Sequence, residues 1–153
     1  MRIGILSDTH DLLRPEVLPL LKGSDHILHL GDVGDPEILG ALAKIAPVTA
    51  IRGNVDMHGP CAQLPATEVV TLAGIDLYLL HNIQELDLDP AAAGFAAVLY
   101  GHSHKPEIRR HKSVLYMNPG SCGPRRFQLP ITCGRITIDA AGTMNAEILP
   151  LQI

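Results

Sequence analysis

Three short apolar segments alternate with two helix-like segments in the first third of the chain, and this order restricts the fold. Residues 2–7, 26–30 and 48–51 are apolar runs that end in polar or turn-forming residues, which is typical of buried strands. Residues 14–21 and 35–45 fit helices, and an Asp-Pro-Glu sequence starts the second of them. Strands that alternate with helices join by right-handed crossovers and form a parallel sheet covered on both faces.

The second half of the chain changes to strands with few helices. Residues 68–72 and 75–80 flank Ala73-Gly74, a two-residue link typical of an antiparallel hairpin. A short alanine-rich helix is expected at 90–94, and further strands at 97–100, near Ile108, and at 114–117, 135–138 and 147–149. The sequence therefore predicts an α/β fold, with two mixed β-sheets sandwiched between helices in a single domain over residues 1–153.

Size, charge and cysteine content exclude several classes of protein. The length of 153 residues and the apolar fraction of 46% indicate one domain with a sizeable core, and the net charge of −4 leaves no broad basic face for duplex nucleic acid. The longest uncharged apolar run, residues 90–100, is too short for a membrane span. The three cysteines form no CxxC pair, and the first residues lack a signal-peptide pattern. We therefore expect a cytoplasmic protein without a membrane partner.

Polar motifs follow five of the predicted strands, directly after each strand ends. In open α/β sheets the ligand crevice lies beyond the carboxyl ends of the strands, so these motifs are expected to meet there. In two of the motifs a spacing of two residues lets an extended segment aim both side chains the same way. The motifs are Asp8-Thr9-His10, Gly31-Asp32, Gly53-Asn54, His81 and Gly101-His102-Ser103-His104.

The side chains in these motifs form a set of oxygen and nitrogen donors without a thiolate. Seven candidate metal ligands exceed the four that a structural zinc site takes, and they suit two metal ions that share a bridging carboxylate. Taken singly, each motif also fits a turn or a hydrogen-bonded core histidine. The combination at five strand ends favours a site for two metals, with Asp32 as the bridge. The seven candidates are Asp8, His10, Asp32, Asn54, His81, His102 and His104.

Together the motifs resemble the calcineurin-like metallophosphoesterase superfamily, and more narrowly its small single-domain phosphodiesterase branch, to which the retromer scaffold subunit is related. The resemblance implies a four-layer αββα fold with two metal ions. It places Asp8, His10 and His104 on the first metal and Asn54, His81 and His102 on the second, with Asp32 bridging. It runs through residues 7–10, 29–32, 52–56, 80–81, 101–104 and 118–121.

The resemblance implies hydrolysis of a small phosphoester by a hydroxide that bridges the metals, most simply a phosphodiesterase reaction. Asp32, Asn54 and His81 are the residues expected to act in catalysis. Manganese is the favoured ion, with iron, zinc or nickel as alternatives. Two other functions stay open: a phosphomonoesterase or nucleotide hydrolase at the same site, and a non-catalytic scaffold with this fold.

Three positions depart from the family pattern and leave parts of the mechanism open. Val55 stands where many members carry a histidine near the leaving group, so the general acid is unidentified. Asp11 and Asn82 stand where glycine is common. Candidate substrate contacts lie on two long irregular stretches, His58 on residues 54–66 and Arg125 and Arg126 on residues 118–130. The substrate, the native metal and any homo-oligomer are not determined by the sequence.

Overall fold

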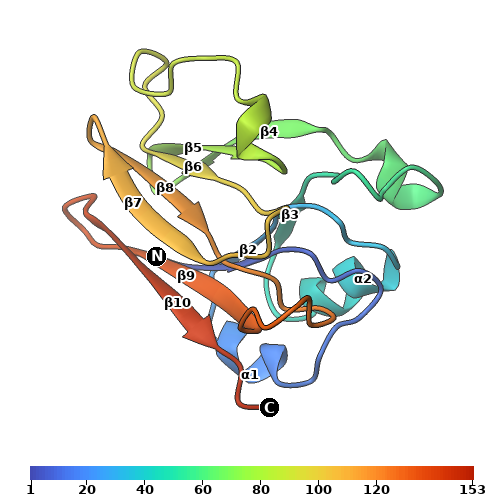
Figure 1. The fold of residues 1–153 in the computed structure, drawn as a ribbon. Coiled ribbons are helices and arrows are strands. Elements are labelled where there is room, and N and C mark those ends of the chain that lie inside the picture. Colours follow the sequence, from blue (N-terminus) through green and yellow to red (C-terminus); the bar gives the residue numbers. More distant parts are fainter.

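The first of two β-sheets contains the amino-terminal strands. The computed structural model describes all 153 residues, and this sheet has five strands in the order β10-β9-β1-β2-β3 (Figure 1). The strands β1, β2 and β3 are parallel, as predicted, while β9 runs antiparallel to β1 and β10 antiparallel to β9. The bounds are β1 (Arg2–Leu6), β2 (His26–His29), β3 (Val48–Ala50), β9 (Thr132–Ile138) and β10 (Met144–Pro150).

The second sheet also has five strands and is likewise mixed, with the order β4-β5-β6-β8-β7. The hairpin predicted at Ala73-Gly74 is confirmed, and both residues have the positive φ that a tight hairpin turn requires. The bounds are β4 (Thr67–Leu72), β5 (Ile75–Leu80), β6 (Ala97–Leu99), β7 (Glu107–His111) and β8 (Val114–Asn118).

The main core lies between the two sheets, because every second side chain of each strand points toward the opposite sheet. In β5, Leu77 and Leu79 are fully buried in this core, while Tyr78 and Leu80 belong to a separate cluster on the outer face. On the outer face of the first sheet, α1 (Val17–Leu21) and α2 (Glu37–Ala43) bury their apolar sides against that sheet. The two sheets and this helical layer confirm the predicted arrangement.

The outer face of the second sheet is covered differently from the expectation. Its cluster is capped by the 3₁₀ helix η2 (Ile83–Glu85) and by Leu86 and Phe95. The helix expected at 90–94 is wrong, since the segment forms only turns and Gly94 has a φ of 80°. A single turn fixes several dihedral angles for few hydrogen bonds, so a short segment between Pro90 and Gly94 does not sustain a helix.

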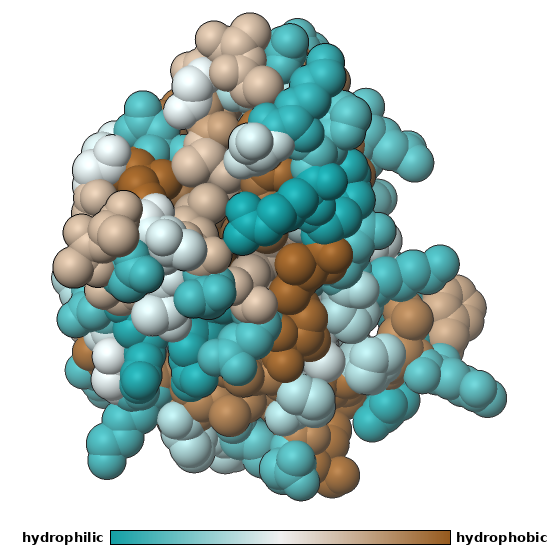
Figure 2. Space-filling view, turned by 90° about the vertical axis from the view of Figure 1, so that its left-hand side faces the viewer, coloured by the Kyte–Doolittle hydropathy of each residue, from teal (hydrophilic) through white to brown (hydrophobic).

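Both loops expected to lack regular structure are largely irregular. The first contains the 3₁₀ helix η1 (Pro60–Gln63), and the second connects β8 to β9. None of the helices in the structure has the length and apolar character of a membrane span. The face shown in Figure 2 carries small apolar areas among hydrophilic side chains.

Replacement of Leu79 by alanine tests the core between the sheets. Leu79 is fully buried, so Leu79→Ala should lower the free energy of unfolding by about 3 kcal/mol, through lost transfer energy and a residual cavity. Val69→Ala on the same hairpin is the control, because Val69 is 45% exposed and should lose less than about 1 kcal/mol. Urea denaturation of both variants measures the difference, and equal losses would contradict the assigned core.

Candidate metal centre

The ends of five strands from both sheets bring the predicted ligands together. Asp8 and His10 follow β1, Asp32 follows β2 and Asn54 comes shortly after β3, all from the first sheet. The second sheet supplies the other three candidates, with His81 directly after β5 and His102 and His104 after β6. The site therefore lies where the carboxyl ends of parallel strands in two packed sheets meet, as expected for an α/β fold.

Six of the seven candidates form two groups whose donor atoms lie within 4.8 Å of one another. One group is Asp8, His10 and His104, and the other is Asp32, His81 and His102. The seventh, Asn54, joins the second group through a contact of 3.1 Å between its Oδ1 and Nδ1 of His102. This division is the one that the resemblance implies.

Asp32 belongs to the second group but faces histidines of both groups. Its Oδ2 is 3.4 Å from Nε2 of His10 and 3.2 Å from Nε2 of His81. The Oδ1 of Asp8 is 3.4 Å from Nε2 of His104. Donors about 2.1 Å from one metal ion are separated by roughly 3.0–3.4 Å at octahedral or tetrahedral angles, so these spacings suit a coordination sphere.

Buried side-chain nitrogen and oxygen atoms without a hydrogen-bond partner are concentrated at this site. Such atoms are expensive in a folded protein, and most buried polar groups find a partner. All five that occur in the structure belong to predicted ligands, and bound cations would satisfy four of them, since His104 can ligate through only one of its two ring nitrogens. The five atoms are Asp8 Oδ1, His10 Nε2, His81 Nε2, His104 Nδ1 and His104 Nε2. The residues present therefore fit a metal centre.

Strained backbone conformations are also concentrated at the site. Asp8, His10, Asp32, His102 and His104 all have φ between 44° and 72°, in the left-handed region that side chains rarely adopt. Such conformations persist where the surrounding structure imposes them, and they cluster at functional sites. The chain thus turns sharply at the ligands, so that their side chains face one another.

Two glycines allow the ligand loops to approach closely. A Cβ at Gly53 would overlap the Asp32 carboxylate, and a Cβ at Gly101 would overlap Oγ of Ser7 and lie 2.7 Å from Oδ2 of Asp8. The glycine of the Gly-Asn motif is therefore required by contact between two loops of the first sheet, and that of the Gly-His motif by contact between loops of different sheets. This gives a packing reason for motifs that sequence analysis interpreted only through their ligands.

Hydrogen bonds set the orientation of His81 and of the neighbouring His29. The Nδ1 of His81 donates to the carbonyl of Leu30 at 2.7 Å, which leaves the lone pair of Nε2 for a metal. The backbone N–H of Gly31 donates to Nδ1 of His29 at 3.2 Å, so His29 carries its proton on Nε2, 3.0 Å from Oγ1 of Thr9. His29 thus supports the segments on either side of the site.

Asp56 connects two of the ligand loops, a role that the sequence left open. Its buried carboxylate accepts hydrogen bonds from the backbone N–H groups of Val33, Gly34 and Gly53, at 2.9–3.1 Å. The first two of these donors directly follow Asp32 on one loop, and the third directly precedes Asn54 on the other. In the sequence, the only sign of this role is that Asp56 stands two residues after the predicted ligand Asn54.

The acids and histidines shift one another's pKa values. Burial opposes ionisation of Asp8, but His10 and His104 outweigh it and lower the Asp8 pKa. The pKa of His10 is raised, mainly by Asp8. Burial disfavours the charged form of His81, yet Asp32 still raises its pKa. The site therefore has a strong negative potential that attracts cations, protons included.

The predicted substrate contacts lie outside the two ligand groups. His58 is exposed and has no hydrogen bond or ion pair with any predicted ligand. Arg125 donates to the carbonyl of Leu129 within its own loop at 3.0 Å, so its guanidinium is partly engaged there. Arg126 is exposed and close enough to His10 to oppose the rise of its pKa. Of the three, Arg126 is the one for which the structure indicates proximity to a predicted ligand.

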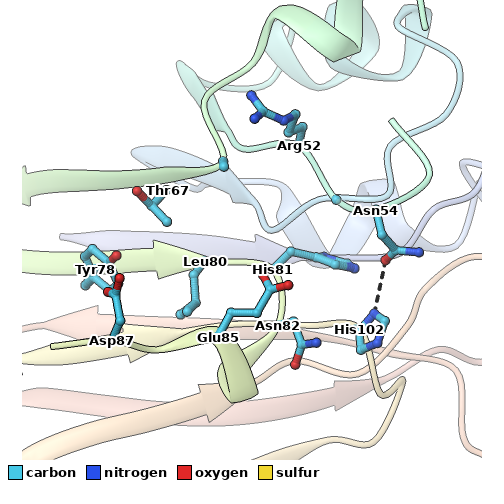
Figure 3. A pocket seen from close by; sticks show the side chains of 12 residues that line it. Arg52, Asn54, Thr67, Tyr78, Leu80, His81, Asn82, Glu85, Asp87 and His102 are labelled. Carbon is cyan, nitrogen blue, oxygen red and sulfur yellow. Dashed lines mark hydrogen bonds between the residues drawn. The ribbon is translucent and has the colours of Figure 1, made fainter. Parts of the chain in front are cut away.

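A cavity that sequence analysis did not anticipate adjoins the second ligand group (Figure 3). Asn54, His81 and His102 form one end of it, and its other charged residues are Arg52, Glu85 and Asp87. Glu85 belongs to η2, and Asp87 follows it closely. No motif marks these positions, because the 3₁₀ turn that brings them to the site has no clear sequence pattern.

The chain belongs to the calcineurin-like phosphoesterase superfamily, whose domain matches residues 1–141. This membership, with the two donor groups, implies divalent metal ions as cofactors. A relative in Methanocaldococcus jannaschii, named as a probable metallophosphoesterase, is 34% identical over 99% of this chain and 82% of its own length. A phosphodiesterase of the same organism is 24% identical over 96% of this chain and 94% of its own length.

Solved structures show the same fold at low sequence identity. An archaeal phosphodiesterase matches with a TM-score of 0.78 and 23% identity, over 97% of this chain and all of its own. Vacuolar protein sorting 29 of Cryptosporidium parvum matches with a TM-score of 0.76 and 17% identity, over 99% of this chain and 98% of its own. The predicted architecture and family are thus confirmed, while the individual ligand roles stay predictions.

Asp56→Ala tests the connection between the ligand loops. Three buried N–H groups lose their acceptor, so the free energy of unfolding should fall by about 3 kcal/mol and metal affinity by about 10–100-fold. Asp139→Ala is a matched control, because Asp139 also accepts backbone N–H groups, from Ala141 and Thr143, but in an exposed turn. Urea denaturation and metal titration measure both, and equal effects would refute the role of Asp56.

Stability should depend on pH through His29. Burial lowers the folded-state pKa of His29 to about 4, whereas its ordinary value is 6.5. The unfolded chain then binds more protons between these values, so His29 makes stability fall as the pH drops from 6.5 towards 4. The loss is of the order of 3 kcal/mol, since one pKa unit corresponds to about 1.4 kcal/mol.

His29→Gln isolates this contribution in metal-free protein. The stability advantage of the natural chain over the variant, measured by urea denaturation, should shrink between pH 7 and pH 4 by about that amount. An advantage that is the same at both pH values would show that His29 does not titrate in this way.

Proposed function

We propose that this chain is a phosphodiesterase that depends on two divalent metal ions held by the seven predicted ligands. The observation that carries the proposal is the convergence of unpartnered donor atoms from Asp8, His10, His81 and His104 on one buried place. When bound, such ions activate water as a nucleophile and stabilise negative charge on the phosphoryl oxygens.

Asp32 is proposed as the shared ligand, because its Oδ2 faces histidines of both groups. Its Oδ1 accepts the backbone N–H of Val55 at 3.0 Å, which fixes the carboxylate while Oδ2 faces the site. His81 is oriented by the Leu30 carbonyl, and the side chain of Asn54 by His102. These contacts hold the ligands ready for ions and substrate, a form of preorganisation that lowers the energy needed at the moment of reaction.

Manganese is the proposed ion, because the resemblance to the family favours it and the site offers carboxylate oxygens beside its imidazoles. Iron, zinc and nickel are alternatives, and activity after reconstitution of metal-free protein with each ion would distinguish them. The three cysteines are free and buried, which supports a reducing, cytoplasmic setting for the protein. The proposed partner is a small phosphoester substrate, without duplex nucleic acid or a membrane.

A diester is preferred over a monoester because of the charges around the site. A monoester dianion needs more positive charge than a diester, yet the exposed acid Asp11 directly follows His10 in the chain and the exposed acid Glu85 lines the cavity with His81. Val55 is 46% exposed and cannot donate a proton, so the leaving group must be protonated by water or another residue. A non-catalytic scaffold is disfavoured, because all seven donor residues are retained.

Asp32→Asn tests the proposed function. The variant should bind fewer than two ions, and its turnover should be at least about 100-fold lower, because the introduced amide lacks the negative charge that holds two cations together. Metal is removed, manganese is restored, and bound metal is counted beside hydrolysis of bis(para-nitrophenyl) phosphate and para-nitrophenyl phosphate. Asp25→Asn is the control, since Asp25 is exposed and accepts the N–H of Arg2, which an amide oxygen also accepts.

The natural chain should prefer the diester in this assay. Two bound ions with full turnover in Asp32→Asn would contradict the bridging role. A manganese-loaded natural chain that hydrolyses neither ester would contradict the assignment as a phosphodiesterase.

A further inference from the structure

The cavity beside the second ligand group has a size suited to a small organic group. Its volume is about 410 Å³, within the range of small-molecule sites. Figure 3 shows that it extends from Asn54 and His102 at one end to Tyr78 and Asp87 at the other. A phosphoester bound at the ligands would therefore have room on this side for one of its two alcohols.

The floor of the cavity is apolar and its walls are polar. Tyr78 and Leu80 are buried at its base, and Tyr78 stacks on Phe95 from behind, which holds the ring in place. Arg52 and Thr67 lie on one side in Figure 3, opposite Asn82 and Glu85. An apolar base with polar walls suits a group that has both C–H faces and hydroxyls.

The polar side chains offer both donors and acceptors. The Oδ1 of Asn82 accepts the N–H of Gln84 at 3.0 Å, which leaves its amide NH₂ as a free donor among the lining residues. Arg52 uses one N–H for the carbonyl of Leu64 at 2.7 Å, and its other guanidinium N–H groups remain donors at this edge of the cavity. The carboxylates of Glu85 and Asp87 accept only. Hydroxyl groups satisfy both kinds of partner, since each can donate and accept.

Other alcohols match these walls poorly. An aliphatic group would displace water from the carboxylates and the guanidinium, and it could not replace the hydrogen bonds that this water makes. A second phosphate would meet the like charges of Glu85 and Asp87. A cationic amine would pair with Glu85 and Asp87, but it would be opposed by Arg52 and would leave the amide donors of Asn82 and the guanidinium donors of Arg52 unpaired.

We propose that this cavity is the subsite for one alcohol of the phosphodiester, and that this alcohol is an uncharged, hydroxyl-rich group such as a polyol or a sugar. The inference deepens the proposed function and rests on it, because it names the substrate class of the same site. Glu85, Asp87, Arg52 and Asn82 determine the specificity, while Tyr78 and Leu80 support the carbon skeleton.

Three substrates with the same leaving group test this subsite in manganese-loaded protein. They are the glyceryl, propyl and choline esters of para-nitrophenyl phosphate. The natural chain should show a kcat/KM for the glyceryl ester about tenfold or more above that for the propyl ester, because the site's carboxylates pair with hydroxyls. A glyceryl ester no better than the propyl ester, or a choline ester preferred over both, would overturn the inference.

Variants assign the preference to the proposed residues. In a Glu85→Ala, Asp87→Ala double variant the ratio of glyceryl to propyl kcat/KM should fall to within about twofold of unity. Both residues are exposed, so the variant is expected to fold. Glu37→Ala is the control, since Glu37 is an exposed acid on α2, and the ratio should not change. An unchanged ratio in the double variant would assign the preference elsewhere and contradict the proposal.

A binding measurement separates failure of this inference from failure of the proposed function. In magnesium-loaded protein, glycerol phosphate should shift the backbone amide resonances of Thr67, Asn82 and Asp87, while inorganic phosphate should leave them unchanged. If no ester is hydrolysed, the proposed function fails, yet these shifts would still support the subsite. Equal effects of glycerol phosphate and phosphate on these amides would overturn the subsite, whatever the turnover.

Discussion

Two buried carboxylates that face a cluster of histidines are the constraint on which the rest of the structure depends. Asp8 is fully buried, and its Oδ2 accepts the hydroxyl of Ser7 and the N–H of His102, while its Oδ1 has no hydrogen bond. A buried charge costs several kcal/mol unless it is paired. The histidines lower the carboxylate pKa values in return for a rise in those of His10 and His81. Bound dications would neutralise the same negative charge and would be ligated by atoms that lack a hydrogen-bond partner.

The two-sheet architecture is suited to meeting this constraint. Each sheet ends its parallel strands at one edge, and stacking the sheets brings loops from distant parts of the chain face to face. The loops approach closely because Gly53 and Gly101 have no side chain, and they turn sharply at ligands with positive φ. Asp56 then connects two of them through the backbone. Fold and site are thus specified by the same short motifs.

Sequence analysis predicted the strands well because apolar runs and turn residues are local signals. It placed the hairpin at Ala73-Gly74 and the parallel order of the first strands correctly. It failed at residues 90–94, where alanine content suggested a helix that tertiary structure does not support. Among site residues, the place of the motifs after strands correctly predicted that the candidate ligands lie together, while their roles stay predictions. Arg52 lay within a segment of the resemblance but was given no role, and Glu85 and Asp87 were missed, since they reach the cavity through an irregular segment without periodicity. The contacts of Asp56 were also beyond sequence analysis, since they depend on two loops distant in sequence.

The central claim is that this edge of the two sheets holds a pair of divalent ions with Asp32 between them. Anomalous diffraction from crystals grown with manganese tests it most directly, because the scattering locates each ion independently of any activity. The account predicts two peaks about 3.5–4 Å apart, one beside Asp8, His10 and His104 and the other beside Asn54, His81 and His102. A single peak, or peaks remote from the Asp32 carboxylate, would contradict it.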